Sequence, residues 1–164
     1  MLAQTGMTTM EDLIAVLPSE DRLHKGPVAI FECFQKIPCN PCAEACPQGV
    51  ISFPDDINEC PILDSKRCNG CGVCLSHCPG LSIFIVDYTY SPHEALLKIP
   101  YEFSPVPETG TVVAAIDRTG AEAGVAHVIR VQQNSNKTCI LWLVVPKEMA
   151  MRVRNIRERK QANE

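Results

Sequence analysis

Apolar residues fall in short runs along this chain, and turn-forming residues separate the runs, as is typical of strands. Residues 28–31 follow Gly26 and Pro27 and are apolar at every position. Residues 81–90 are apolar at consecutive positions from 83 to 86 and alternate afterwards. The two segments are predicted to be the first and last strands of one domain.

The pattern changes after residue 110. Residues 111–117, 125–132 and 138–145 each predict a strand, with turn-forming residues between them. Residues 140–145, Ile-Leu-Trp-Leu-Val-Val, are apolar on both faces. Such a run favours a central strand, since both of its faces must be buried.

A helix is predicted to close the chain. Pro146 suits a first helical turn, and Met149, Val153 and Ile156 then recur at helical spacing. Arginines and a lysine cover the opposite face, but no aromatic residues are interleaved with them. This basic face predicts solvent contact or docking to an acidic partner subunit, and no nucleic-acid binding.

These patterns predict an α+β protein in four segments. They are an N-terminal arm (1–26), a compact domain (27–90), a Pro-rich linker (91–110) with three of its prolines at 100, 105 and 107, and a small β domain ending in a helix (111–164). The arm is predicted to contain a short helix capped by Thr8 or Thr9.

Composition indicates a globular chain with unusual cysteine content. Its 164 residues are 46% apolar and carry a net charge of −4. No run is long enough to span a membrane, and Glu11 and Asp12 interrupt the apolar N-terminus, so no signal peptide is expected. Nine of the ten cysteines lie between Cys33 and Cys78. A secreted disulfide framework is the alternative, but without a signal peptide a reducing cytoplasm and metal or redox chemistry are favoured.

The densest cysteine tract is Cys68-Asn-Gly-Cys71-Gly-Val-Cys74-Leu-Ser-His-Cys78-Pro79. Three cysteines on one tight loop and a fourth one turn later suit an iron–sulfur cluster, because its irons lie close together and thiolates must converge on them. Gly70 and Gly72 allow the loop backbone to wrap closely. His77 is a candidate for tuning such a cluster by a hydrogen bond, or else faces solvent.

An earlier tract repeats this one at an offset of 32 residues. Its Cys39, Cys42, Cys46 and Pro47 correspond to Cys71, Cys74, Cys78 and Pro79. The exception is Lys36, which stands where the second tract has Cys68 and cannot ligate a cluster.

Three completions of the first tract are open. Cys33 lies at the mouth of the same loop, directly after the first strand, and is favoured. Cys60 is the alternative, although it also suits a small buried residue. In the third case, the first site keeps three ligands and an incomplete cluster. Cys139, on a predicted strand, is expected to pack in a core.

Zinc is the competing metal, since four thiolates form a common tetrahedral zinc site. The two Cys-x2-Cys pairs at 39–42 and 71–74 would supply it. Zinc would leave unexplained the third cysteine of the second loop and the two Cys-Pro steps that end the tracts.

The paired tracts resemble the two-cluster bacterial ferredoxins over residues 27–90. In that family the fourth cysteine of each tract ligates the other cluster. The resemblance implies a ferredoxin-like βαββαβ domain with two 4Fe-4S clusters. One cluster would take Cys46, Cys68, Cys71 and Cys74, and the other Cys39, Cys42, Cys78 and Cys33, with Cys60 as the alternative to Cys33. Lys36 departs from the family pattern, which puts the completeness of the first cluster in question.

Residues 18–42 and 145–156 resemble the small iron–sulfur subunit of multi-subunit flavin-dependent dehydrogenases. Those complexes oxidise amines and imino acids such as proline, hydroxyproline and sarcosine. The resemblance implies an electron-transfer subunit, FAD on flavoprotein partner subunits, and no catalytic residues on this chain. The alternatives are a freestanding ferredoxin and a zinc-stabilised interaction module.

Overall fold

The computed structural model describes residues 5–159 and shows an α+β protein dominated by antiparallel strands. The helices are short: α2 (Met10–Ile14), α3 (Glu20–Leu23), α4 (Pro41–Glu44), α5 (Val73–His77) and the 3-10 turn η1 (Lys147–Met149). The strands are β1 (Val28–Phe31), β2 (Ile51–Ser52), β3 (Ile62–Leu63), β4 (Ile83–Asp87), β5 (Glu94–Tyr101), β6 (Val112–Asp117), β7 (Glu122–Gln133), β8 (Cys139–Pro146) and β9 (Val153–Arg157). No helix within residues 5–159 has the length and apolarity to cross a membrane.

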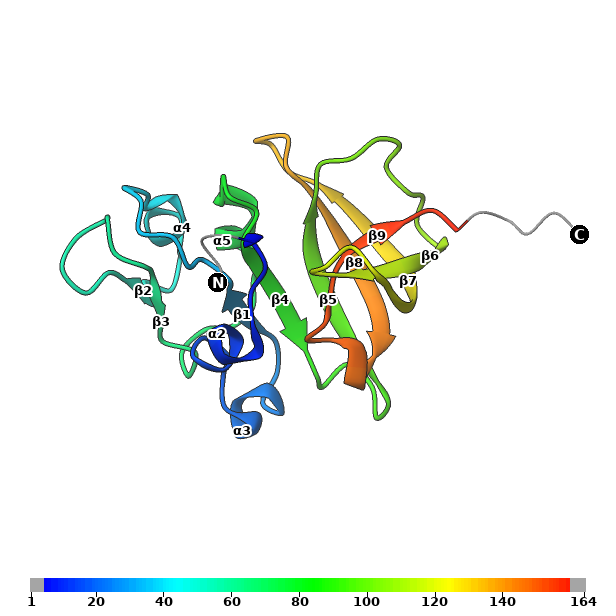
Figure 1. Ribbon diagram of the computed structural model, residues 1–164, viewed down its shortest axis with the longest axis horizontal. Helices are drawn as coiled ribbons and strands as arrows, with labels where there is room; N and C mark the ends of the chain where they lie inside the picture. The colour runs from blue at the N-terminus through cyan, green and yellow to red at the C-terminus, as the bar shows by residue number, and fades with distance from the viewer. Residues whose placement is uncertain (1–4, 160–164) are drawn as a thin grey trace, which may run out of the picture.

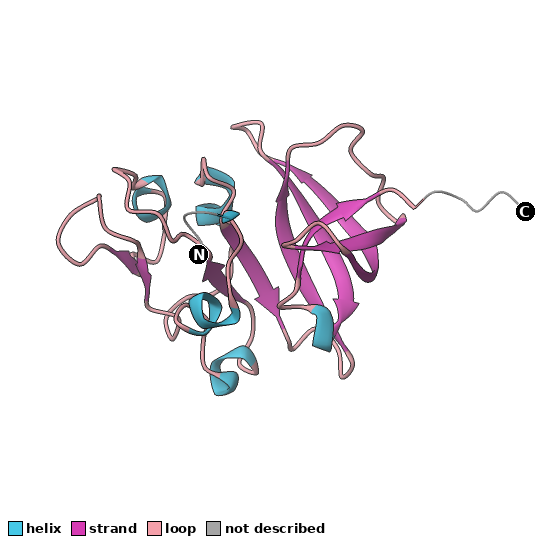
Figure 2. Cartoon of the chain, in the orientation of Figure 1, coloured by secondary structure: helices cyan, strands magenta, loops and turns pink. Residues whose placement is uncertain are grey.

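A seven-stranded antiparallel sheet runs through the molecule in the order β1-β4-β5-β8-β7-β6-β9. The α-helices and the small β2–β3 sheet lie beside β1 and β4, and β5 to β9 lie on the other side together with η1 (Figure 1). Figure 2 shows the same division by element type, with the α-helices at one end and the long strands, with η1 among them, at the other. From β1 to β4 the elements follow the order strand, helix, strand, strand, helix, strand.

The two strands β1 and β4 are buried on both faces, which explains their continuous apolar runs. Ala29 and Ile85, paired across the two strands, face a core that contains several of the cysteines. Ile30 and Phe84 are also paired and face a second core, which the strands β5 to β9 enclose. The pair β1–β4 therefore separates the cysteine-bearing layer from the C-terminal strands.

The N-terminal arm contains two capped helices. Thr9 caps α2 in a reciprocal arrangement, because its side chain accepts from the Asp12 backbone N–H and Asp12 accepts from the Thr9 N–H. Ser19 caps α3, and Arg22 within that helix is buried. The arm thus places the buried Arg22 side chain against the domain that holds the two cysteine tracts.

The prediction of a Pro-rich linker is wrong for its central part, where residues 94–101 form β5. This strand is buried along most of its length and pairs with both β4 and β8. Its Pro100 lies beyond Lys98, where the pairing with β4 stops, so this proline removes no N–H from that pairing. Strand β5 joins the predicted domains 27–90 and 111–164 into one sheet.

The three predicted C-terminal strands are confirmed as β6, β7 and β8, but the predicted terminal helix is wrong. A single 3-10 turn is followed by β9, which pairs with β6. In a regular strand Val153 and Ile156 would face opposite sides. A register shift at this pairing sets Val153 opposite Asp117 and Ile156 opposite Ala115, so both reach the same core. The bulge thus places two apolar residues that are three positions apart on one face, which is also the spacing of an apolar helix face.

Candidate metal centres

Eight cysteines gather around two cavities. The first cavity, with about 310 Å³ of space between atoms, is lined by Cys46, Cys68, Cys71 and Cys74. The second, with about 370 Å³, is lined by Cys33, Cys39, Cys42 and Cys78. These are the two sets that the ferredoxin resemblance implies, including the exchange of Cys46 and Cys78 between tracts. The structure brings each set together, and ligation of a cluster stays a prediction.

The donor chemistry of both cavities fits an iron–sulfur cluster. Each set supplies four soft thiolate donors within an apolar lining that includes Ala29 and Ile85 in one cavity and Phe31 and Ile83 in the other. Within residues 5–159, no three His, Cys, Asp or Glu side chains are grouped as a single metal ion requires. A cubane cluster suits such spread thiols, because each thiolate binds a different iron atom.

The loop of the second tract is shaped by its glycines. Gly70 has a φ of +64°, and a Cβ there would stand 2.5 Å from the Pro27 Cβ atom. Gly72, at +89°, forms the left-handed N-cap of α5. The Gly70 N–H donates to the Cys68 sulfur at 3.4 Å. Glycine at both positions lets the loop pack against Pro27 and direct an amide to the Cys68 sulfur.

A hydroxyl that the sequence analysis missed lies between two sulfurs of the second cavity. Ser82 Oγ is 3.4 Å from Cys78 Sγ and also hydrogen-bonds the Cys33 side chain. Both cysteines line this cavity, and Ser82 lines it with them. The sequence signal for this contact is a small polar residue directly before β4. Its partner Cys33 is distant in sequence, so the contact could not be predicted.

Cys33 and Cys60 take different places. Cys33 lines the second cavity, whereas Glu59 and Pro61 line it without Cys60 between them. Cys60 stays close enough to Cys33 to help raise the Cys33 pKa. Lys36, the departure from the repeat, does not line this cavity and forms an ion pair with Glu59 at 2.8 Å. The geometry thus favours Cys33 as the fourth member of this set.

Burial raises the pKa of three thiols that line these cavities. It raises the pKa of Cys42 to about 11 and that of Cys74 to about 12, and neighbouring cysteines add to both shifts. Burial likewise raises the pKa of Cys33. Thiolates that bind a cluster must lose these protons, so loading releases protons and is favoured by rising pH.

Arg22 ties the arm to the loop of the first cavity. Its guanidinium donates to the carbonyls of Ser65 and Cys68, both at 2.6 Å, and to those of Gly26 and Pro27, both at 2.9 Å. This contact was missing from the sequence-based prediction, because Ser65 and Cys68 lie more than 40 residues from Arg22.

Two other candidates lie away from the sulfurs. His77 is exposed, and its Nδ1 atom lies 3.0 Å from both the Ser76 hydroxyl and the Val73 carbonyl of its own helix. This agrees with the solvent-facing alternative. Cys139 is buried on β8 in the core of the C-terminal strands, as expected.

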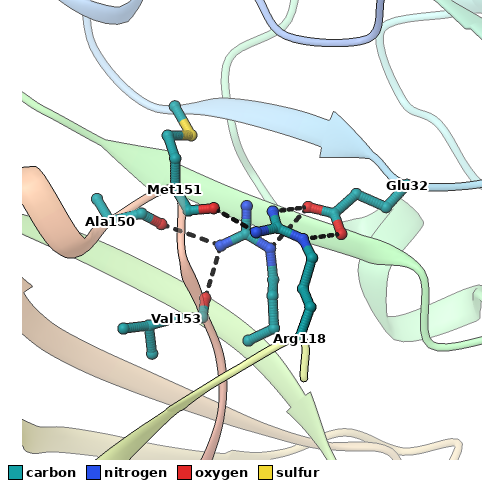
Figure 3. Close-up of polar contacts among 6 residues, drawn as sticks. Glu32, Arg118, Ala150, Met151 and Val153 are labelled. Carbon is teal, nitrogen blue, oxygen red and sulfur yellow. Dashed lines mark hydrogen bonds and ion pairs between the residues drawn. The ribbon is translucent and has the colours of Figure 1, made fainter. Parts of the chain in front are cut away.

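A buried ion cluster lies beside Cys33. Glu32 accepts from the Arg118 Nε atom at 2.8 Å and from the Arg154 Nε atom at 2.7 Å (Figure 3). Backbone carbonyls of Met151, Ala150 and Val153 take further guanidinium bonds. Burial would raise the pKa of Glu32, but the two guanidinium groups outweigh it and lower the pKa below 4.5. This ion cluster of Glu32, Arg118 and Arg154 joins the start of the first cysteine tract to the C-terminal strands.

Comparisons with known proteins agree with the cysteine geometry. Residues 37–80 match the family model of the 4Fe-4S dicluster domain. An uncharacterized ferredoxin from Methanocaldococcus jannaschii is 47% identical over 45 residues, which are 27% of this chain and 28% of that protein. No solved structure matches the chain. The chain therefore contains a ferredoxin-type domain, and the match spans little more than a quarter of its relative.

Proposed function

We propose that this chain is an electron-transfer protein with two 4Fe-4S clusters, one in each cysteine cavity. The observation that carries the proposal is the sorting of eight cysteines into two sets of four, with one member of each set taken from the other tract. A 4Fe-4S cluster with four thiolate ligands supplies one-electron transfer and has no coordination site open to a substrate.

The chain's own residues hold the two sites close together. Cys46 ends the first tract but lies in the first cavity with the cysteines of the second tract, and Cys78 does the reverse. This exchange makes the two cavities neighbours and ties their loops into one unit. Apolar side chains such as Ile83 and Ile85 exclude water from the space between the loops and the sheet.

The partner that we propose is a flavoprotein dehydrogenase of amines or imino acids. A reduced FAD on such a partner gives up two electrons, and a carrier with two one-electron sites can receive them one at a time. The resemblance of residues 18–42 and 145–156 to the small subunit of these complexes supports this proposal. This chain then has no catalytic site of its own, and it works in the cytoplasm, where its thiols stay reduced.

The cluster assignment is tested on anaerobically purified protein by iron and sulfide analysis, absorption spectroscopy and EPR after reduction. We expect iron and acid-labile sulfide in equal amounts and signals from two clusters. A colourless protein that contains zinc and no sulfide would refute the proposal and support the zinc-stabilised module.

The partner assignment is tested by purifying the untagged protein from its native host. We expect it to elute with larger chains that contain flavin, and amine or imino-acid substrate to reduce its clusters in that complex. Elution at its own mass, free of flavoprotein, would refute the subunit role and support a freestanding ferredoxin.

A further inference from the structure

A row of side chains crosses five strands and leads from the first cavity to the C-terminal strands. The register pairs Ala29 with Ile85, Ile85 with Lys98, Lys98 with Trp142, and Trp142 with Arg130. Directly paired residues of neighbouring strands share one face of a sheet. Ala29 and Ile85 line the first cavity, so Lys98 and Trp142 stand beside it on the same face.

Lys98 reaches the loop that holds the cysteines of this cavity. Its ammonium donates to the Gly70 carbonyl at 3.0 Å and lies 3.4 Å from the Cys71 carbonyl. Its alkyl chain packs along the loop, since a Cβ on Gly72 would stand 3.8 Å from the Lys98 Cδ atom. The charge and the stem of this lysine both contact the loop.

Trp142 covers the lysine from the other side. The Lys98 ammonium lies 4.3 Å from the centre of the Trp142 ring, and the exposed Arg130 guanidinium lies 4.9 Å from it. The indole N–H donates to the Gln132 side chain at 3.1 Å, which fixes the ring. A cation held against an aromatic face is partly desolvated, so its charge acts more strongly on nearby groups than an exposed charge does.

We propose that Lys98 is a positioning residue that raises the reduction potential of the cluster held by Cys46, Cys68, Cys71 and Cys74. A reduced cluster carries one more negative charge than an oxidised one, and a fixed cation beside Cys71 stabilises the more negative state. The two carbonyl contacts hold the loop in the shape that surrounds the cluster. Strand β5, outside the matched region 37–80, thereby sets a property of the cluster site.

This inference rests on the proposed two-cluster function, and the experiment separates the two. The full chain is loaded anaerobically and titrated by redox potential with EPR detection of each cluster. The variants are Lys98→Met, which keeps the stem, and Lys98→Arg, which keeps the charge. The control is Lys66→Met, because Lys66 is an exposed lysine two residues before Cys68.

We expect Lys98→Met to lower the equilibrium constant for reduction of one cluster about tenfold. This change lowers the reduction potential of that cluster by ~59 mV for one electron. The other cluster should keep its potential, and Lys98→Arg should restore most of the shift. The control should change little, since solvent and salt screen an exposed charge. Selective loss of that one cluster in Lys98→Met, with retention in Lys98→Arg, would also support the loop-holding role.

Unchanged potentials in Lys98→Met, or equal shifts in both clusters, would overturn the inference while leaving the electron-transfer function intact. Failure of both Lys98 variants to fold would assign the residue to packing alone and would also overturn it. Wild-type protein without iron and sulfide would instead refute the proposed function.

Discussion

Replacing Glu32 by Gln tests whether the ion cluster beside Cys33 holds the two halves of the molecule together. The Glu32 side chain is 8% exposed, and the side chains of Arg118 and Arg154 are 15% and 6% exposed. Glutamine keeps the shape but removes the negative charge. Two guanidinium groups then share a buried site without a carboxylate, and the Arg154 Nη2 atom already has no hydrogen-bond partner within the described residues.

The expected cost follows from removing one member of a buried ion cluster, which typically destabilises a protein by about 3–5 kcal/mol. For a chain of this size, each kcal/mol lowers the melting temperature by about 2–4 °C. Glu32→Gln should therefore melt roughly 6–20 °C below the wild type. The matched control is Glu59→Gln, whose exposed pair with Lys36 should contribute only about 0–1 kcal/mol.

The assay is thermal unfolding of the anaerobic, cluster-loaded protein, followed by circular dichroism at several pH values. The pKa of Glu32 is lowered in the folded chain, so its stabilising effect is present above the ordinary value of 4.5 and is lost as the pH falls through the folded pKa. The gap between wild type and Glu32→Gln should narrow in acid. A variant as stable as Glu59→Gln at neutral pH would refute this reasoning.

Four further substitutions probe the cavities. Cys33→Ser should weaken or convert one cluster in the EPR of the reduced protein, whereas Cys60→Ser should leave both; the reverse result would make Cys60 the ligand. Gly70→Ala should cost more than the ~1–2 kcal/mol of a left-handed residue, because the new Cβ collides with Pro27, and iron analysis should show one cluster lost. Ser82→Ala should lower the potential of the Cys33 cluster only, since the hydroxyl beside Cys33 and Cys78 can no longer donate to a ligand sulfur; a redox titration with no shift would exclude that role.

The cysteine sites could be predicted because their chemistry is local. Two tracts with the same spacing bring most of the thiols into loops. Lys36 stands at the position that corresponds to Cys68, and this mismatch identified the one irregular position of the repeat. The structure then brings Cys33 into the second cavity, as the sequence favoured. The repeated spacing identified the two tracts, the position of Cys33 at the loop mouth favoured it, and the ferredoxin resemblance implied the exchange of Cys46 and Cys78.

The contacts that brace these sites could not be predicted, because they join distant segments. Arg22 contacts Cys68 and Lys98 contacts Gly70, and neither pairing leaves a signal in the spacing of either partner. Strand β5 was hidden by its Pro100 and by the prolines of the flanking segments. Strand β9 was hidden by a bulge that imitates helical periodicity. Both errors arise where tertiary pairing overrides a local pattern.

The pairing of β4 with β5 has a consequence for how the chain unfolds. A sheet made of β1 and β4 alone would present the free backbone groups of β4 as an open edge, where other chains can add strands. Strand β5 covers that edge, and β5 is in turn paired along its whole length with β8. Unfolding of the C-terminal strands would therefore expose the unpaired edge of β4 next to the cysteine cavities, and other chains could add strands to it. We expect the backbone amides of β4, β5 and β8 to show similar protection from hydrogen exchange, because these strands open as one cooperative unit.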